Sequence, residues 1–140
     1  MKLKIFIGLA ILGLAAAIWV YFFMYNKPHP TYKNLKPDFT LEASDLYNQF
    51  KSLPAETALK YNGKMLAVRG LLTQTEVNDS SATAYFVIEE GMFGYQGVRI
   101  AMLAGEAVGS ISNGSAATIK GLCTGFNDSD VILEHGSIVH

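Results

Sequence analysis

Four residues between positions 85 and 99 offer the clearest potential for ligand contact in this sequence. They are three aromatic side chains and one cation, namely Tyr85, Phe93, Tyr95 and Arg99. Three glycines lie among them and allow the backbone to adapt its shape at low steric cost. Aromatic faces beside one arginine suit a peptide or a sugar, because such a surface needs no basic field. We predict that these four residues form a binding surface. The alternative is that Phe93 and Tyr95 cap a hydrophobic core.

The other reactive side chains form no catalytic or metal-binding pattern. Glu89 and Glu90 are neighbours, so on a strand they point to opposite faces and cannot act as an acid–base pair. His135 and His140 are five positions apart, which also places them on opposite faces of a strand. The single cysteine, Cys123, cannot form an internal disulfide and lies in an apolar alternating run, as expected of a core residue. We predict a protein that is not an enzyme, with no metal site and no cofactor.

Strands would have to position the binding surface, because the second half of the chain alternates between inward and outward residue types. Five runs show the two-residue period of a strand, and turn signals separate them. The runs are residues 64–72, 84–88, 98–102, 117–123 and 131–139. A longer connection over residues 105–114 follows the third run. This order predicts a mainly β fold with a five-stranded, OB-fold-like barrel.

A short helical segment precedes these strands. Apolar residues recur at helical spacing after residue 44, and Pro54 can open a second helix that continues to Tyr61. The side chains expected to pack against the barrel are Leu46, Phe50, Leu59 and Tyr61.

The N-terminal part of the chain is long and apolar. Residues Ile5 to Phe23 contain no charged side chain. At about 1.5 Å per residue they would form a helix roughly 28 Å long, close to the hydrocarbon thickness of a bilayer. Ala15 and Ala17 could mark the cleavage site of a signal peptide. Bulky aromatic residues follow directly, and they favour an uncleaved transmembrane anchor over a cleaved signal.

These patterns divide the chain into four parts. We predict a cytoplasmic tail at 1–4, a transmembrane anchor at 5–25, a linker at 26–39 and a helix plus barrel at 40–139. Three prolines between positions 26 and 37 indicate the linker. The very short N-terminal tail is typical of a signal anchor. It predicts a single-pass protein of the inner membrane with its C-terminal domain in the periplasm.

The charge of the chain disfavours a polyanionic ligand. The formal net charge is −1, and from Gly63 onward four basic residues face eight acidic ones, a net charge of −4. Contact with phosphate backbones requires clustered lysines and arginines. Nucleic acid is therefore an unlikely partner on sequence grounds.

Several short motifs resemble a known family. A helix ending Lys60-Tyr61-Asn62-Gly63-Lys64 leads into Ala67-Val68-Arg69-Gly70, and the last part of the chain reads Ile119-Lys120-Gly121-Leu122-Cys123-Thr124-Gly125-Phe126. Together they resemble the tRNA_anti-like family of small bacterial OB-fold proteins, over roughly Asn26 to Val139. The resemblance implies an OB-fold similar to the anticodon-binding barrel of tRNA synthetases. It implies no catalytic residues.

The sequence thus favours a membrane-anchored binding module for a protein, peptide or sugar partner. One alternative is a carrier of haem or another small ligand, because a tethered OB barrel resembles the haem chaperone of cytochrome c maturation. The His-x-x-x-Tyr tail of that chaperone is not found in this sequence. A further alternative is oligonucleotide binding.

Overall fold

The computed structural model describes residues 1–25 and 31–140, which belong to two compact units divided after Pro30. The first unit is the helix α1 (Lys2–Val20), extended by one turn of π-helix, η1 (Tyr21–Tyr25). None of its residues is buried. Within the part of the chain that the structure describes, this is the one helix long and apolar enough to cross a membrane.

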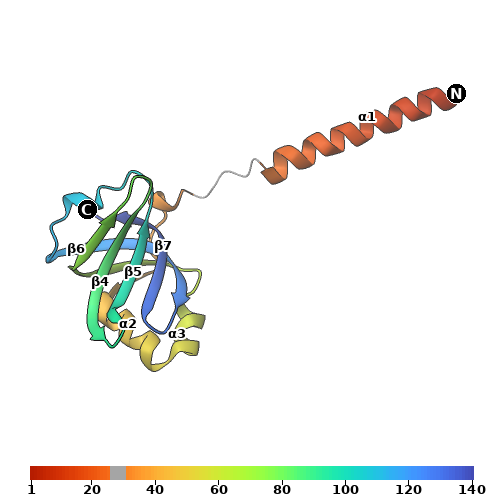
Figure 1. Cartoon of the computed structure of the whole chain (residues 1–140). Helices are drawn as coiled ribbons and strands as arrows, with labels where there is room; N and C mark the ends of the chain where they lie inside the picture. The colour runs from red at the N-terminus through yellow and green to blue at the C-terminus, as the bar shows by residue number, and fades with distance from the viewer. Residues whose placement is uncertain (26–30) are drawn as a thin grey trace. The chain divides into compact units, whose positions relative to one another are not determined.

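The second unit, residues 31–140, is a mainly β domain with two helices at one end of its sheet (Figure 1). Its elements in chain order are η2 (Tyr32–Asn34), β1 (Phe39–Glu42), α2 (Ala43–Ser52), α3 (Pro54–Tyr61), β2 (Met65–Leu72), β3 (Gln74–Val77), β4 (Ala82–Gly91), β5 (Gly94–Met102), η3 (Val108–Ser110), β6 (Ser115–Phe126) and β7 (Asp130–Ile138). The hydrogen-bonded strand order is β1-β2-β6-β7-β5-β4-β3. The pairs β1–β2 and β5–β7 are parallel, and the others are antiparallel.

The predicted mainly β fold is confirmed, but the sheet differs from the predicted five-stranded barrel in its number of strands and in not being closed. The sheet has seven strands, and its hydrogen-bonded order does not close on itself. The five predicted runs are present as β2, β4, β5, β6 and β7. The additional strands are β1, which pairs with the outer edge of β2, and β3, which continues the chain beyond β2.

Thr73 separates β2 from β3 because the chain changes strand partner there. β2 pairs with β6, whereas β3 pairs with β4. The Thr73 backbone N–H donates to Tyr85 O at 2.9 Å, and its hydroxyl donates to Leu71 O at 3.2 Å. The same hydroxyl oxygen accepts the Val87 N–H at 3.1 Å. One side chain therefore supplies the hydrogen bonds that the strand ladder lacks at this point.

The two helices close the end of the domain by burying one face each. Leu46, Phe50 and Tyr61 pack in the core, as predicted. Leu59 is 89% exposed, so its predicted packing is wrong. The buried positions of α3 are Thr57 and Tyr61, four residues apart, and a residue midway between them faces the opposite side of the helix.

Cys123 is a buried free thiol, as its alternating sequence predicts. Its Sγ lies 3.6 Å from Asn62 Oδ1, within reach of a weak S–H hydrogen bond. Burial raises the pKa of the thiol to about 11, so the group stays protonated and unreactive near neutral pH.

The segment predicted as a linker, 26–39, only partly fits that description. Residues 26–30 lie outside the described residues. Residues from Thr31 onward belong to the domain unit, and Phe39 already begins β1. Asp38 joins the sheet just before that strand: its N–H donates to Met65 O at 2.7 Å, and its Oδ2 accepts the Met65 N–H at 2.9 Å.

At Gly97, strands β4 and β5 are packed closely, next to the irregular pairing between Val87 and Glu89. A Cβ at this position would lie 2.0 Å from Phe86 O, so Gly97→Ala requires the backbone to move. We expect this change to lower the free energy of unfolding by about 1–3 kcal/mol, measured by urea denaturation. The control is Gly109→Ala, where the nearest atom lies 4.0 Å away and the change should be near neutral. Equal losses in both variants would contradict this account of the contact.

Candidate ligand-binding surface

Tyr85 and Arg99 lie side by side on the outer face of the sheet. They are direct partners in the β4–β5 register, next to Phe86 and Val98, which are paired core residues. Neighbours along a strand point to opposite faces, so Tyr85 and Arg99 point outward. The Arg99 guanidinium carbon lies 5.9 Å from the centre of the Tyr85 ring, within the range of a cation–π contact.

The Tyr85 hydroxyl is also occupied on this face. It donates a long hydrogen bond of 3.4 Å to Glu76 Oε2 on β3. Partial burial raises the pKa of Tyr85, an effect that Arg99 opposes and Glu76 reinforces. Tyr85 is therefore a neutral donor beside one cation and one carboxylate.

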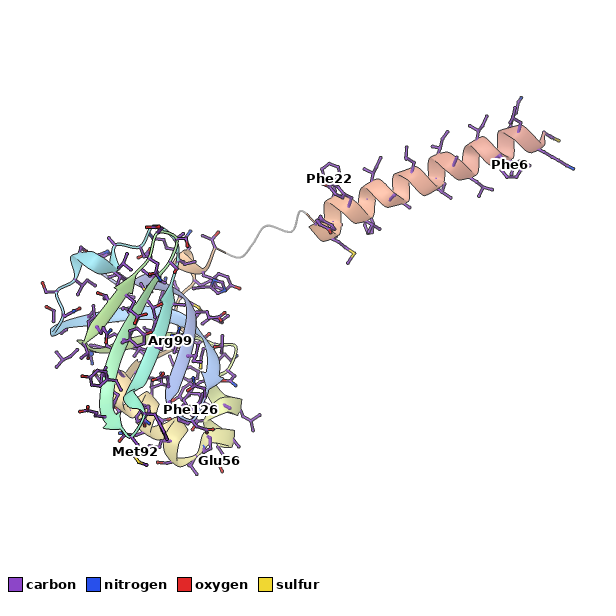
Figure 2. The ribbon with its side chains drawn as sticks, in the orientation of Figure 1. Phe6, Phe22, Glu56, Met92, Arg99 and Phe126 are labelled. Atoms are coloured by element: carbon purple, nitrogen blue, oxygen red, sulfur yellow. The ribbon has the colours of Figure 1, made fainter. Side chains whose placement is uncertain are left out.

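Phe93 and Tyr95 lie at the tip of the β4–β5 hairpin, not in the core. Phe93 is 97% exposed, Met92 beside it 93% and Tyr95 63%. These values rule out the alternative that Phe93 and Tyr95 cap the core. Figure 2 places Arg99 midway along the sheet and Met92 at the end of the domain that carries Glu56 of α3.

The four predicted residues thus occupy one hairpin but two places on it. Tyr95 and Arg99 are four positions apart on β5, which puts them on one face and about 13 Å apart along the strand. We call Met92, Phe93 and Tyr95 the hairpin apex, and Tyr85 with Arg99 the mid-strand pair. A ligand that touches both must extend along the hairpin.

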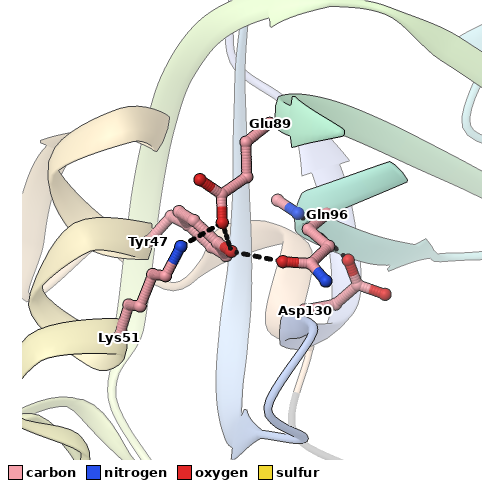
Figure 3. A network of polar contacts seen from close by, with 6 residues as sticks. Tyr47, Lys51, Glu89, Gln96 and Asp130 are labelled. Carbon is pink, nitrogen blue, oxygen red and sulfur yellow. Dashed lines mark hydrogen bonds and ion pairs between the residues drawn. The ribbon is translucent and has the colours of Figure 1, made fainter. Parts of the chain in front are cut away.

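A polar network fixes the base of this hairpin to α2 (Figure 3). The Tyr47 hydroxyl donates to Glu89 Oε1 at 2.7 Å, and the same carboxylate oxygen forms an ion pair with Lys51. The Tyr47 oxygen also lies 2.9 Å from the Gln96 side-chain amide. The atom that faces the Tyr47 oxygen is Gln96 Oε1, so the single phenol proton lies between two acceptors, of which the Glu89 carboxylate is the closer.

The electrostatics of the network keep its protons in place. Burial, followed by the hydrogen bond to Glu89, raises the pKa of Tyr47 to about 12. The hydrogen bond from Lys51, followed by that from Tyr47, lowers the pKa of Glu89. At neutral pH the phenol therefore remains a donor and the carboxylate an acceptor.

Two further features restrict the hairpin beside this network. Gln96 lies so close to Gly91 that a Cβ on Gly91 would be 2.4 Å from Gln96 Nε2. The Gly97 N–H donates to Asp130 Oδ1 at 3.1 Å, which ties β5 to the start of β7. The apex thus projects from a base that is hydrogen-bonded to α2 and to β7.

The sequence singles out the aromatic residues of the apex but gives little sign of the network. Tyr47 is one of the residues that recur at helical spacing after residue 44, and Lys51 and Gln96 belong to no motif. The Tyr47–Glu89 bond spans 42 positions, so no local pattern reveals it. The one available signal was a tyrosine in an otherwise apolar helix stripe, because a buried tyrosine hydroxyl needs a polar partner.

The histidines and carboxylates do not gather into a ligand set. Among residues 1–25 and 31–140, no group of three His, Cys, Asp or Glu side chains is placed to hold a metal ion. His135 instead stacks on Tyr32, with ring centres 3.9 Å apart.

Comparisons with known proteins agree with this architecture. A family model described as tRNA_anti-like matches residues 1–137. A crystal structure from Klebsiella pneumoniae subsp. pneumoniae MGH 78578, of a protein described as a candidate nucleic acid-binding lipoprotein, is similar with a TM-score of 0.51. The sequences are 20% identical, and the similarity covers 81% of this chain and 100% of that chain. At this identity the likeness concerns the fold alone. None of the curated proteins matches the chain.

The network should contribute measurably to stability. Tyr47→Phe removes the donor to Glu89, and we expect it to lower the free energy of unfolding by about 1–2 kcal/mol at pH 7. Tyr95→Phe removes a hydroxyl from an exposed ring and should have little effect. Chemical denaturation of both variants checks this, and equal effects would show that the network adds nothing.

The same network predicts a pH dependence with a defined sign. The folded-state pKa of Glu89 is lowered, so its stabilisation is present above the unfolded pKa of about 4.3 and is lost as pH falls through the folded value. Wild type should therefore be more stable than Glu89→Gln at pH 7, and the difference should disappear on acidification. A difference that is constant down to pH 3 would contradict this assignment.

Proposed function

Because this chain belongs to the tRNA_anti-like family, we propose that residues 31–140 form a non-catalytic, OB-like binding module. The strand order supports this proposal. If β2 and β3 are counted as one strand bent at Thr73, the sheet has five strands in the order β2/β3, β6, β7, β5 and β4, besides β1. The bent strand then pairs with β6 through β2 and with β4 through β3. The OB-fold is a five-stranded, partly open barrel, and the similarity to the Klebsiella structure is consistent with it.

The binding surface of this module is the β4–β5 hairpin. OB-folds generally bind ligands on the face of their second and third strands, which correspond here to β4 and β5. All four residues predicted from the sequence, Tyr85, Phe93, Tyr95 and Arg99, lie on these strands or on the turn that joins them. The observation that carries the proposal is the near-complete exposure of Phe93 on a hairpin whose base is fixed by hydrogen bonds.

The chemistry of the apex fits a protein partner best. Phe93 and Met92 present apolar side chains without a polar group, whereas sugar binding requires hydrogen-bond donors and acceptors beside the ring. The nearby polar groups of Glu89 and Gln96 are engaged with α2. A fixed apex loses little conformational entropy on binding, so aromatic anchors of this kind contribute strongly to protein interfaces. The partner surface is an apolar depression that receives the Phe93 ring.

The module is held at a membrane by the N-terminal helix. α1 and η1 are apolar throughout after Lys4, and the helix is long enough to span a bilayer. The similar Klebsiella protein is described as a lipoprotein, which is also a membrane-attached form. Our proposal is a single-pass inner-membrane protein with the domain in the periplasm, where the hairpin apex meets a partner of the cell envelope.

The double variant Phe93→Ala with Tyr95→Ala tests the binding surface. We expect it to lower recovery of membrane neighbours about tenfold or more after chemical cross-linking in cells, because hot-spot truncations cost about 2 kcal/mol or more. The domain should keep its thermal transition, since both rings are exposed.

Leu59→Ala is the matched control, because Leu59 is another exposed apolar side chain, on α3. It should change neither recovery nor the thermal transition. If the double variant instead collapses the thermal transition while recovery per folded molecule is unaltered, the two rings are structural and the site lies elsewhere.

Oligonucleotide binding is a second candidate, favoured by the description of the Klebsiella protein. Exposed aromatic rings beside an arginine can stack on bases. The charge argues against it, since residues 31–140 carry eight basic and twelve acidic side chains. Fluorescence polarisation with labelled single-stranded RNA and DNA decides between the two. We expect no binding at physiological salt; binding that weakens steeply as salt rises would favour the nucleic-acid function.

A further inference from the structure

A row of outward-facing residues on the sheet is unexpectedly buried. Ala67 on β2 pairs with Lys120 on β6, and Lys120 pairs with Ser137 on β7. Their strand neighbours Leu66 and Ile119 belong to the core, so this row points to the opposite face. Ala67 is nevertheless only 3% exposed and Ser137 only 1% exposed. Something must cover this outer face.

Segment 31–37, which we call the strap, lies against this face and contacts Lys120, the middle residue of the row. The Lys120 ammonium donates to the backbone oxygens of Lys33 and Leu35, the latter at 2.8 Å. The Tyr32 ring stacks on His135 with an interplanar angle of 1°. Lys33 Nζ lies 2.8 Å from Glu106 Oε1, and Glu106 Oε2 accepts the Ile138 N–H at 3.1 Å. These contacts join the strap to β6, to β7 and to the loop before η3.

The attachment of the strap is weaker than that of the chain beyond it. Every strap residue except Tyr32 is exposed, and no strap residue is part of a strand. Asp38, by contrast, makes two hydrogen bonds with Met65, and β1 then pairs with β2. Segments with few buried apolar contacts are the first to open in a native protein. Asp38 is therefore the natural end point of any opening.

The buried hydroxyl of Ser137 in this row makes the attached position of the strap less stable. Within the described part of the chain, the Ser137 hydroxyl is the one buried side-chain polar atom without a hydrogen-bond partner. A buried hydroxyl that makes no hydrogen bond is unfavourable compared with the same group in water. Ser137 pairs with Lys120, whose ammonium holds the strap, so we expect opening of the strap to make this hydroxyl more accessible to water and to offset part of the contacts that are lost.

We propose that the strap is a releasable clasp, which detaches as far as Asp38 while the rest of the domain stays folded. In the closed state five residues, 26–30, separate the apolar N-terminal helix from the domain. In the open state residues 26–37 do so, and the seven added residues extend the maximum span by about 25 Å. The longer distance that the domain could reach from a membrane depends on the proposed anchor, whereas the opening of the strap does not.

Trypsin provides a direct test on the full chain in detergent micelles. Lys27 and Lys36 each precede a proline, which blocks trypsin, so Lys33 is the one susceptible position between Lys4 and Lys51. The variants Glu106→Gln and Lys120→Met remove the domain side of the clasp and leave the strap sequence intact. We expect the double variant to be cleaved after Lys33 about tenfold faster than wild type, with an unchanged thermal transition of the domain.

Glu42→Gln is the matched control, because it removes the other ion pair of this half of the sheet, with Arg69, without touching the strap. It should leave cleavage after Lys33 unchanged. Two outcomes overturn the proposal. One is an equal cleavage rate in the double variant and wild type. The other is faster cleavage accompanied by loss of the folded domain, which would make the strap an integral part of the fold. Neither readout depends on ligand binding, so failure of the clasp and failure of the proposed function are distinguishable.

Discussion

The change of strand partner at Thr73 is the constraint on which the domain depends. Because β2 pairs with β6 whereas β3 pairs with β4, the sheet must curl until Gly70 meets Phe86. A Cβ at Gly70 would lie 3.3 Å from the Phe86 ring and 3.1 Å from Ala43 Cβ, so the strand and the start of α2 approach as closely as glycine permits. α2 then enters the curled sheet and carries Tyr47 and Phe50 into the core. The position of the β4–β5 hairpin relative to α2 follows from this closure.

The β4–β5 hairpin combines a base that is fixed by hydrogen bonds with an apex whose apolar side chains are exposed. The Tyr47 phenol is fully buried, which would be unfavourable without Glu89 and Gln96 as partners. By satisfying that hydroxyl, the network also fixes the hairpin base to α2. An exposed phenylalanine on a loose loop would tend to bury itself against the nearest apolar surface. Here Phe93 is exposed above a base that is fixed by hydrogen bonds.

Strand periodicity predicted most of the fold, because five runs with inward Leu, Val, Ile and Phe must share one core. The split at Thr73 left no signal, since threonine is an ordinary strand residue and its role depends on Tyr85 and Val87 across the sheet. β1 was missed because four residues after a proline-rich stretch are too few to show a period. The mid-strand pair and the apex could be found from residue type, but their separation along the hairpin required the strand register. The helix face of Leu59 was misjudged because an apolar residue does not by itself indicate which side of a helix is buried.

The parallel strand β1 has a practical consequence for work with the isolated domain. It occupies the outer edge of β2 by pairing Phe39 to Glu42 with Leu66 to Arg69. A soluble fragment that started at α2 would leave that edge with unsatisfied N–H and C=O groups. Such an edge promotes intermolecular strand pairing and aggregation. Two such fragments could also complete each other's sheets artificially and imitate a dimer. A fragment intended for solution work must therefore begin upstream of Asp38.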